Sequence, residues 1–288
     1  MVSRVVAIIV SFEPDLAALG GLLDRLHGEV AESVIVDNGS SMNVAGFVSA
    51  RGKPRESCLA LGENLGIAAA QNRGIGMAQA AGADAVVLFD QDSLPPPGMV
   101  ATLAEAIIAL KAANMRPAAV GPTPVDARLP PRAGSHAASA APVTVDHLIA
   151  SGCLIPLAVL DAVGGMREDL FIDYVDIEWC LRAGAAGYHC YRLPSLAMAH
   201  EFGAPISVLG RSYASHGALR HYYLFRNSVW LWRQAAIPLG WRLKTAPRIA
   251  LRLIFNLLFA RPHRQQWSMM GQGLADGFAG RMGPWHPR

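Results

Sequence analysis

The feature that most constrains the fold is a short apolar run, residues 85–89, that ends in two aspartates one residue apart, Asp90 and Asp92. The run is partly β-branched, Gly82 precedes it, and three consecutive prolines, residues 95–97, follow it. A run this short, bounded by residues that end regular structure, is typical of a buried central strand rather than a helix. We therefore expect Asp90 and Asp92 at the carboxyl end of a central strand.

The position of these two aspartates indicates a binding site. In an open α/β sheet, ligands bind at the carboxyl ends of the strands, and residues i and i+2 of an extended segment point the same way. Two carboxylates on one side of a loop repel each other unless a positive charge lies between them, and a divalent cation that carries a diphosphate is a natural candidate. The structural alternative is that Asp90 ends the strand, while Asp92 and Ser93 cap the next helix.

Segments with strand-like and helix-like patterns alternate as far as residue 113. Besides the run that ends at Asp90, strands are predicted over residues 5–12, 33–37 and 58–61, and helices over about 16–26, 67–81 and 98–113. This alternation predicts an α/β fold with a doubly wound, mainly parallel sheet and right-handed crossovers. Asp37 ends the second strand in the turn sequence Asp-Asn-Gly-Ser, so it is either a third carboxylate of the site or only a turn former.

The pattern changes after residue 120. Prolines, glycines and small residues predict a long irregular loop over about 121–142, of the kind that forms a mobile lid or an acceptor loop. A strand is then predicted over 143–150, a helix from 151–154 to about 164, a helix over the second half of 171–182, and short strands over 189–193 and 196–199. We expect one domain over residues 1–209, with halves of about 1–122 and 143–209, and a helical extension over 210–288.

The extension is aromatic and basic. No Asp or Glu lies between Phe202 and Ala275, whereas these ten cations do: Arg211, Arg220, Arg226, Arg233, Arg242, Lys244, Arg248, Arg252, Arg261 and Arg264. A basic extension on an acidic body indicates an anionic partner, either lipid headgroups, a nucleic acid or a phosphorylated substrate. The apolar run over 249–259 is too short, and Arg252 too central, for a transmembrane helix, so we expect an interfacial helix or a buried helical cap.

The cysteines and the first apolar run bear on the compartment. Residues 5–10 are too few to span a membrane, and no signal-peptide cleavage pattern follows them. Cys58, Cys153, Cys180 and Cys190 show no Cys-x-x-Cys pairing and lie in apolar surroundings, which is typical of reduced, buried thiols. These observations predict a cytoplasmic protein.

The common glycine-rich nucleotide sites are absent from the sequence where they would be needed. Residues 11–14, after the first strand, contain no glycine for a dinucleotide fingerprint, and Gly74 and Gly76 fall inside a predicted helix rather than at its start. No Gly-Lys-Ser/Thr loop occurs in the chain, and residues 11–19 lack the Gly-rich, Arg/Lys-containing loop of a sugar-1-phosphate nucleotidyltransferase. A sugar-nucleotide fold that binds diphosphate through a metal is consistent with this pattern.

Several stretches, in this order, resemble the inverting family 2 glycosyltransferases of GT-A fold, and within them the bacterial rhamnosyltransferases. The stretches are residues 34–40, 64–75, 89–93 and 171–182, then His200, Tyr222-Tyr223, Arg226-Asn227, and the tail 273–281. The resemblance covers nearly the whole chain, and its order and spacing carry more weight than any single motif. The rhamnosyltransferase assignment rests mainly on Asp-Gln-Asp-Ser at 90–93, Ala-Ala-Ala-Gln-Asn at 68–72 and the tail.

The resemblance implies a role for each candidate residue. Asp37 would contact the nucleoside base and Asp90 the ribose or nucleotide, while Asp92 would bind Mg²⁺ or Mn²⁺ on the diphosphate. His200 matches the family histidine that approaches the metal or diphosphate, although a histidine after a strand can also be an ordinary satisfied side chain. Arg226 would clamp the diphosphate, or belong to the basic surface. The remaining residues expected to bind the nucleotide sugar are Asn64, Gln71 and Arg73.

The catalytic base is the hardest assignment. Inverting transfer needs a carboxylate on the acceptor side to take the hydroxyl proton. The family's Glu-Asp pair maps onto Val175-Asp176, which makes Asp176 the candidate, although Val175 replaces the glutamate. Asp173 or Glu178 could share or take the role, and the structural alternative is that Asp173 and Asp176 only cap the helix.

By resemblance, the donor is dTDP-L-rhamnose and the acceptor a glycan, lipid-linked precursor or glycolipid in cell-surface polysaccharide or glycolipid synthesis. We expect the basic extension to hold the enzyme on the inner face of the plasma membrane, with no nucleic-acid partner; packing on the protein's own body or on a second copy is the alternative. The rival functions are a family 2 enzyme with another donor and a non-catalytic anion- or lipid-binding protein.

Overall fold

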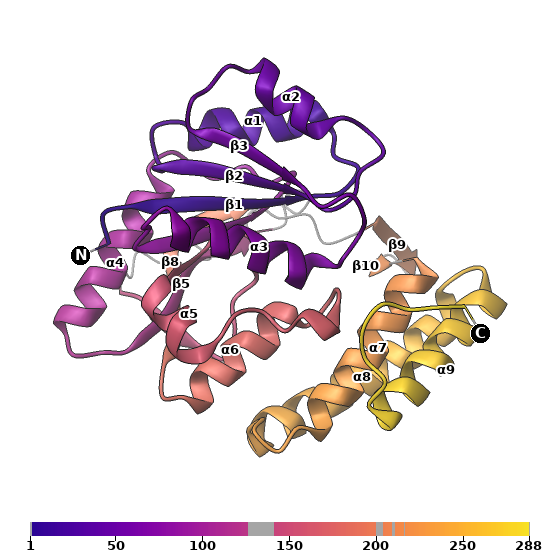
Figure 1. Ribbon diagram of the computed structural model, residues 1–288. Coiled ribbons are helices and arrows are strands. Elements are labelled where there is room, and N and C mark those ends of the chain that lie inside the picture. The colour runs from indigo at the N-terminus through magenta and orange to yellow at the C-terminus, as the bar shows by residue number, and fades with distance from the viewer. Residues whose placement is uncertain (1, 126–140, 200–203, 209–210, 216, 288) are drawn as a thin grey trace.

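A computed structural model describes residues 2–125, 141–199, 204–208, 211–215 and 217–287 (Figure 1). A central sheet carries helices on both faces, and three further helices form a region beside the end toward which β1 and β2 point (Figure 1). The mixed α/β architecture with a mainly parallel central sheet confirms the predicted fold class.

The central sheet has eight strands in the order β3-β2-β1-β4-β7-β5-β8-β6. Strands β3, β2, β1, β4, β5 and β8 run in one direction, whereas β7 and β6 run opposite to their neighbours. The strands are β1 Val5–Ser11, β2 Glu32–Asp37, β3 Glu56–Ala60, β4 Ala85–Asp90, β5 Pro117–Val125, β6 Val143–Val145, β7 Cys153–Pro156 and β8 His189–Ala199. A separate antiparallel pair is formed by β9 Ala204–Val208 and β10 Arg211–Ser215.

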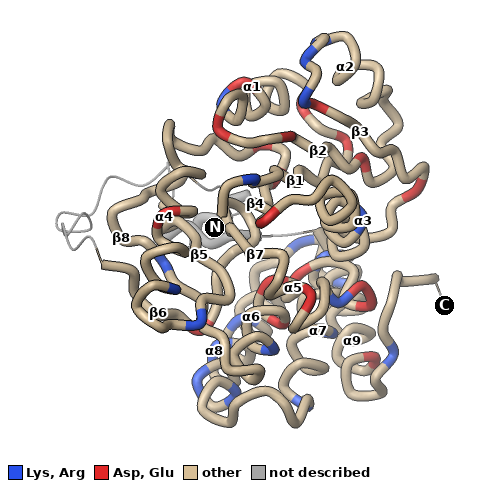
Figure 2. The backbone as a smooth tube through the Cα atoms, turned by 60° about the vertical axis from the view of Figure 1, so that its left-hand side comes forward, with Lys and Arg blue, Asp and Glu red and all other residues tan. Residues whose placement is uncertain are grey.

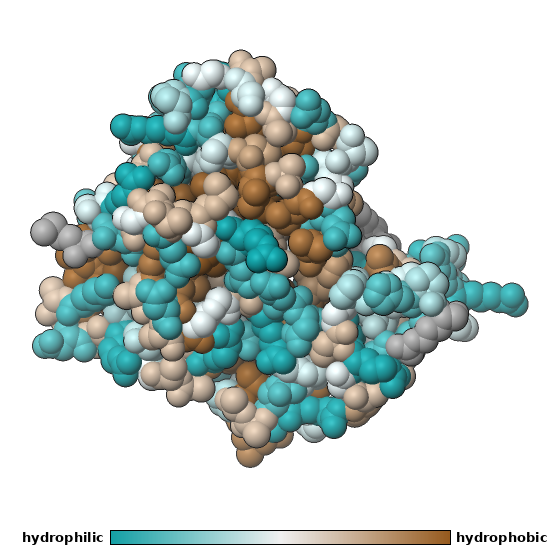
Figure 3. Space-filling view, in the orientation of Figure 1, coloured by the Kyte–Doolittle hydropathy of each residue, from teal (hydrophilic) through white to brown (hydrophobic). Residues whose placement is uncertain are grey.

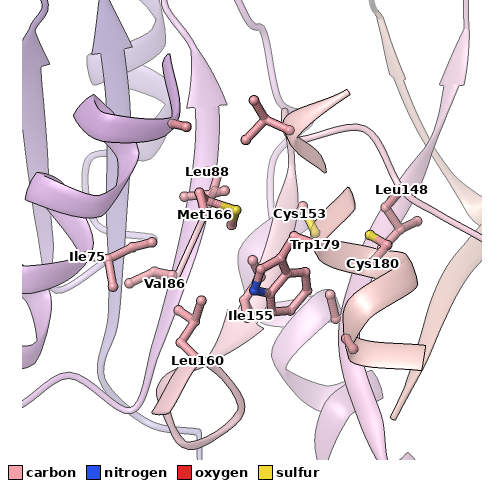
Figure 4. Packing of buried hydrophobic residues seen from close by; sticks show 14 of the residues in the cluster. Ile75, Val86, Leu88, Leu148, Cys153, Ile155, Leu160, Met166, Trp179 and Cys180 are labelled. Atoms are coloured by element: carbon pink, nitrogen blue, oxygen red, sulfur yellow. The ribbon is translucent and has the colours of Figure 1, made fainter. Parts of the chain in front are cut away.

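Helices cover both faces of the sheet, which is why its central strands are apolar throughout. Neighbouring residues of β1 enter different cores, because Ile9 packs with the α1 and α4 side and Ile8 with the α3, α5 and α6 side. Figure 4 shows the second core, where Trp179 and Leu160 pack near Val86. The helices are α1 Leu16–Leu26, α2 Val44–Ala50, α3 Ile67–Ala80, α4 Met99–Ala112, α5 Leu157–Val163 and α6 Val175–Ala185.

The middle of the chain differs from the sequence prediction. Residues 153–156, expected to begin a helix, form β7, because Gly152 turns the chain at a φ of +81° and the helix α5 starts only at Leu157. The strand expected over 143–150 is limited to β6, and the two strands expected over 189–199 are one, β8. The first residues of the loop expected over 121–142 belong to β5 instead, and residues 126–140 lie outside the described part of the chain.

Three C-terminal helices follow: α7 Ala218–Arg233, α8 Leu239–Phe259 and α9 His263–Ala279. Helices α7 and α9 pack at backbone contact, since a Cβ on Gly277 would lie 2.5 Å from the carbonyl oxygen of Arg226, and one on Gly273 would clash with the carbonyl oxygen of Tyr222. The Tyr222 hydroxyl donates to Asp276 Oδ2 at 2.7 Å across the same contact. The glycines and the aspartate of the tail therefore hold two helices together.

Two smaller findings concern the cysteines and the membrane. All four cysteines are free, and Cys153, Cys180 and Cys190 are buried as expected, whereas Cys58 is only half-buried. None of the described helices has the length and hydropathy needed to cross a bilayer.

Candidate functional site

Two aspartates of the predicted site, Asp37 and Asp90, end the strands on either side of β1, and Asp92 lies in the turn after β4. In the strand register, Asp37 of β2 lies opposite Ser11 of β1, and Asp90 of β4 lies opposite Val10. Because β2, β1 and β4 are adjacent and parallel, their carboxyl ends meet at one edge. The structure therefore brings Asp37 and Asp90 to the same rim, with Asp92 two residues beyond Asp90.

Asp37 belongs to a buried hydrogen-bond network. Its Oδ1 accepts from the hydroxyls of Ser11, at 3.3 Å, and Ser40. The next residue, Asn38, donates from Nδ2 to Asn64 Oδ1 at 3.0 Å and accepts from the Leu65 backbone N–H at 2.9 Å. These bonds join the loops after β2 and β3, so Asp37 and Asn64 have structural work in addition to any ligand contact.

The turn after β4 leaves Asp92 exposed. Asp92 has no hydrogen-bond or ion-pair partner among the described residues. Its neighbours are fixed, since Gln91 Oε1 accepts from the Phe12 N–H at 2.7 Å and the Ser93 hydroxyl lies 2.5 Å from that of Ser151. A short bridge also pairs Leu94 with Ala199, the residue before His200, but His200 itself lies outside the described residues.

A cation at Asp90 and Asp92 would have to be shared with a ligand. No group of three His, Cys, Asp or Glu side chains in the described part of the chain could hold a metal ion by itself. Mg²⁺ is commonly held by one or two carboxylates together with substrate phosphates, and hard oxygen ligands also suit Mn²⁺. An ion at this rim would thus be bound by Asp92, with Asp90 beside it, only together with a diphosphate.

Asp176 lies in the first turn of α6 and lines a small cavity with Gln71, Leu88, Ala150 and other residues. Its Oδ1 accepts from the adjacent Ile177 N–H at 2.8 Å. Burial raises the pKa of the Asp176 carboxyl to about 6, and the negative charge of Asp173 adds to this increase. A carboxylate with this pKa is ionised at neutral pH and is a better proton acceptor than an ordinary aspartate.

Gln71 is the second polar group at this cavity. It is buried in α3, and its Oε1 has no hydrogen-bond partner among the residues that the structure describes. A buried unsatisfied amide oxygen is unfavourable unless a ligand or water supplies a donor. Arg73, two residues further along α3, is exposed, so Gln71 and Arg73 lie on different faces of the helix.

Asp173 and Glu178, the two alternatives for the base, are both held in ion pairs. Asp173 lies 3.1 Å from Arg220, and Glu178 Oε1 lies 2.9 Å from Arg182. Arg182 also donates to the carbonyl oxygen of Val163 and so ties α6 to the end of α5. Asp173 and Glu178 therefore stabilise the loop and helix around Asp176.

The placement of Arg226 corrects its expected role as a diphosphate clamp. Arg226 is 0% exposed, and its guanidinium donates to the backbone carbonyl oxygens of Asp169, Leu170 and Gly283. A side chain buried and engaged in this way is not presented to a ligand at the sheet edge. The burial follows from tertiary packing that sequence alone does not reveal.

Asn227, which the sequence reading did not single out as a site residue, supports the loop before Asp176. Its Nδ2 donates to the carbonyl oxygens of Leu170, Ile172 and Asp173 at 2.8–2.9 Å. These bonds hold a strained segment, because Phe171, Asp173 and Tyr174 have φ values of 62–67°. The only sequence signal was the Arg-Asn pair itself.

The other side of this loop is fixed by α3. The Phe171 carbonyl oxygen accepts from the Ile67 N–H at 2.8 Å, and the Phe171 ring stacks on Tyr223 at 4.8 Å between centroids. Asn72 bonds Met166 in both directions at 2.8 Å, from Nδ2 to the carbonyl oxygen and from the Met166 N–H to Oδ1. Helices α3 and α7 thus hold the segment that leads into Asp176.

The comparisons with known proteins agree with this geometry. Residues 8–133 match the model of glycosyl transferase family 2. The chain is 31% identical to dTDP-rhamnosyl transferase RfbF of Shigella flexneri, over 83% of each protein.

Solved structures share the fold at lower sequence identity. TarS 1-349 of S. aureus matches 96% of this chain and 81% of its own at a TM-score of 0.62 and 16% identity. GalNAc-T7 with UDP, GalNAc and Mn²⁺ matches 96% of this chain and 56% of its own, at a TM-score of 0.62 and 11% identity. With the carboxylate rim and the relative at 31% identity, the chain belongs to glycosyl transferase family 2 and is a glycosyltransferase.

Proposed function

We propose that the protein is a metal-dependent inverting rhamnosyltransferase with dTDP-L-rhamnose as donor. The observation that carries the proposal is a cavity lined by Asp176, whose pKa burial raises to about 6, and by Leu88 of β4, two residues before Asp90 at the carboxylate rim. The 31% identity to a dTDP-rhamnosyl transferase supports the choice of donor. The site thus combines a proton acceptor with groups suited to a nucleotide diphosphate.

The rim would bind the nucleotide. Asp37 would contact the base and Asp90 the ribose, with Asn64 and Arg73 alongside. Gln71 would accept a hydrogen bond from the donor sugar, because its Oε1 is buried at the cavity of Asp176 without a partner in the described part of the chain. Asp92, with His200, would hold Mg²⁺ or Mn²⁺, and the bound cation would offset the charge on the departing diphosphate.

Transfer would then be a single displacement. The acceptor oxygen forms a bond to the anomeric carbon, and the bond from that carbon to the diphosphate oxygen breaks with its electron pair leaving on dTDP. The acceptor proton passes to the carboxylate of Asp176. Asp173 and Glu178 do not serve as the base in this mechanism, because Arg220 and Arg182 occupy them.

We propose a glycan or lipid-linked acceptor of cell-surface polysaccharide or glycolipid synthesis, used on the cytoplasmic side of the plasma membrane. The support is the basic C-terminal region, which has no Asp or Glu between residues 202 and 275. Such a region attracts anionic lipid surfaces.

Turnover of a panel of nucleotide sugars tests this function. Release of dTDP from dTDP-L-rhamnose should exceed release of the corresponding nucleoside diphosphate from dTDP-glucose, UDP-glucose, UDP-GlcNAc and GDP-mannose. EDTA should abolish the release, and added Mg²⁺ or Mn²⁺ should restore it. A preference for another sugar would replace the donor, whereas binding without turnover in the presence of acceptor extracts would favour a non-catalytic protein.

A further inference from the structure

Helix α8 has an outer face that the rest of the described chain leaves uncovered. Its exposed apolar side chains are 54% to 69% exposed: Leu239, Leu243, Leu251, Ile254 and Leu258. At 3.6 residues per turn these five positions fall within an arc of about 120°. Every other residue in that arc is Gly, Pro, Ala or Leu, so it contains no polar side chain. We call this surface the α8 strip.

The opposite side of α8 is already occupied. Trp241 and Asn256 are buried, and Ile249 and Leu253 pack against the cluster of Leu224, Phe225 and Met270 from α7 and α9. Leu257, at one margin of the strip arc, packs against the same cluster. The helix is therefore fixed to the protein by one face, and the α8 strip is a second apolar face. The side of this C-terminal region seen in Figure 3, formed largely by α9, is in contrast mainly hydrophilic.

Cations flank the α8 strip. Lys244, Arg248 and Arg252 are exposed and lie to one side of the strip, at about 140°, 180° and 220° on the same helical projection. Lys244 Nζ also lies 3.8 Å from Asp146 Oδ2 in an exposed ion pair. Figure 2 shows Lys and Arg, and no Asp or Glu, along α8. The aromatic rings of Trp267 and Phe259 are also exposed, and the Trp267 indole N–H donates to the carbonyl oxygen of Leu257, near the end of the helix, at 2.8 Å.

We propose that α8 lies in the plane of an anionic membrane surface, with the α8 strip in the boundary between headgroups and acyl chains. An apolar stripe with basic residues beside it and aromatic residues at its end is the pattern of an interfacial helix. The cations then meet anionic headgroups, and the helix needs no spanning length. This inference deepens the membrane-side part of the proposed function, on which it rests, by naming the surface, and it does not depend on the donor sugar.

A second copy of the chain fits the same face less well. In a two-fold contact of strip on strip, Lys244, Arg248 and Arg252 of both copies would flank one seam. Asp146 lies 3.8 Å from Lys244 within one copy, but α8 itself has no acidic residue to pair with Arg248 and Arg252, and like charges brought together in this way oppose association. Anionic lipid is the occupant that matches both the apolar arc and its charge.

Flotation with vesicles tests the proposal on the full chain. Wild-type protein should float with vesicles that contain phosphatidylglycerol at low salt, less at high salt, and little with pure phosphatidylcholine. The triple variant Leu251→Ser, Ile254→Ser, Leu258→Ser should lower the partition coefficient on the order of a hundredfold, since it removes three apolar side chains from the strip. The pair Lys244→Gln, Arg248→Gln should lower it on the order of tenfold on anionic vesicles.

The matched control is Ile108→Ser, which removes a similar exposed apolar side chain from α4 and should float like wild type. Donor hydrolysis in detergent-free solution should be unchanged in all variants, so loss of flotation and loss of the proposed activity are separable. The proposal is overturned if wild-type protein ignores anionic vesicles at low salt. It is also overturned if the charge pair floats like wild type while sedimentation shows a dimer that the triple variant dissociates.

Discussion

Replacing Asp176 by asparagine is expected to separate catalysis from stability. The variant keeps the size and the hydrogen-bonding atom that accepts from Ile177 but cannot take a proton. Loss of a positioned base typically costs on the order of a hundredfold or more in rate. We therefore expect transfer to fall by that factor, while the affinity for the donor stays near the wild-type value.

The same change should make the protein more stable at neutral pH. The pKa of Asp176 is raised from 3.8 to about 6, so the folded state binds its proton more tightly than the unfolded state does. The cost of ionising it in the fold is absent well below pH 4, grows between pH 4 and 6, and is complete above pH 6. A shift of about 2 units corresponds to about 3 kcal/mol, which Asp176→Asn should recover at pH 8 and mostly lose by pH 4.

Urea unfolding at pH 8 and pH 4, together with the pH dependence of kcat/KM, measures both effects. Wild-type kcat/KM should rise with pH through an apparent pKa near 6, because the base must be ionised. Asp161→Asn on α5 is the matched control, since Asp161 is exposed, and should change neither quantity. The reasoning is refuted if Asp176→Asn transfers at the wild-type rate, or if Asp173→Asn or Glu178→Gln alone is inactive with its fold intact.

Three further predictions concern the metal rim and the C-terminal helices. Asp92→Ala should abolish EDTA-sensitive donor binding without lowering the unfolding midpoint, because the side chain is exposed. Glu105→Ala is the exposed acidic control, and a wild-type EDTA response in Asp92→Ala would contradict the metal assignment. Asn227→Ala should destabilise the protein by about 1–3 kcal/mol and lower kcat more than KM, because three carbonyl oxygens of the loop before the base lose their hydrogen-bond donor. An unchanged kcat would contradict the supporting role of Asn227. Gly273→Ala should lower stability by about 1–3 kcal/mol in urea unfolding, as the added methyl meets the Tyr222 carbonyl oxygen, whereas the exposed Gly271→Ala should not.

Strands β1, β2 and β4 could be predicted because they are buried on both faces, whereas the half-buried β3 begins two residues before its predicted start and the short helix α2 was not predicted. β1, β2 and β4 appear in the sequence as continuous apolar runs, and the structure places their ends within a residue of the prediction. β7 was missed because four apolar residues before a helix have no periodicity to distinguish them from the helix. Its antiparallel pairing with β4 and β5 is a tertiary feature.

The location of the three aspartates could be predicted because their position along the chain decides their position in space. Asp37, Asp90 and Asp92 follow strands, so the parallel sheet brings them together. The burial of Arg226 could not be predicted because its hydrogen-bond partners are far away in sequence: the Leu170 carbonyl oxygen that it binds lies 56 residues earlier. The sequence shows that an arginine is able to bind a phosphate, but not whether its N–H groups already donate to other atoms in the folded protein.

The central claim is that this edge of the sheet binds dTDP-L-rhamnose through a divalent cation. Calorimetric titration of the wild-type protein with dTDP-L-rhamnose, in Mn²⁺ or Mg²⁺ and then in EDTA, tests it most directly. We predict saturable binding that EDTA removes, and weaker binding of UDP- and GDP-linked sugars under the same conditions. Binding that persists unchanged in EDTA, or no binding of any dTDP-sugar with metal present, would contradict the account.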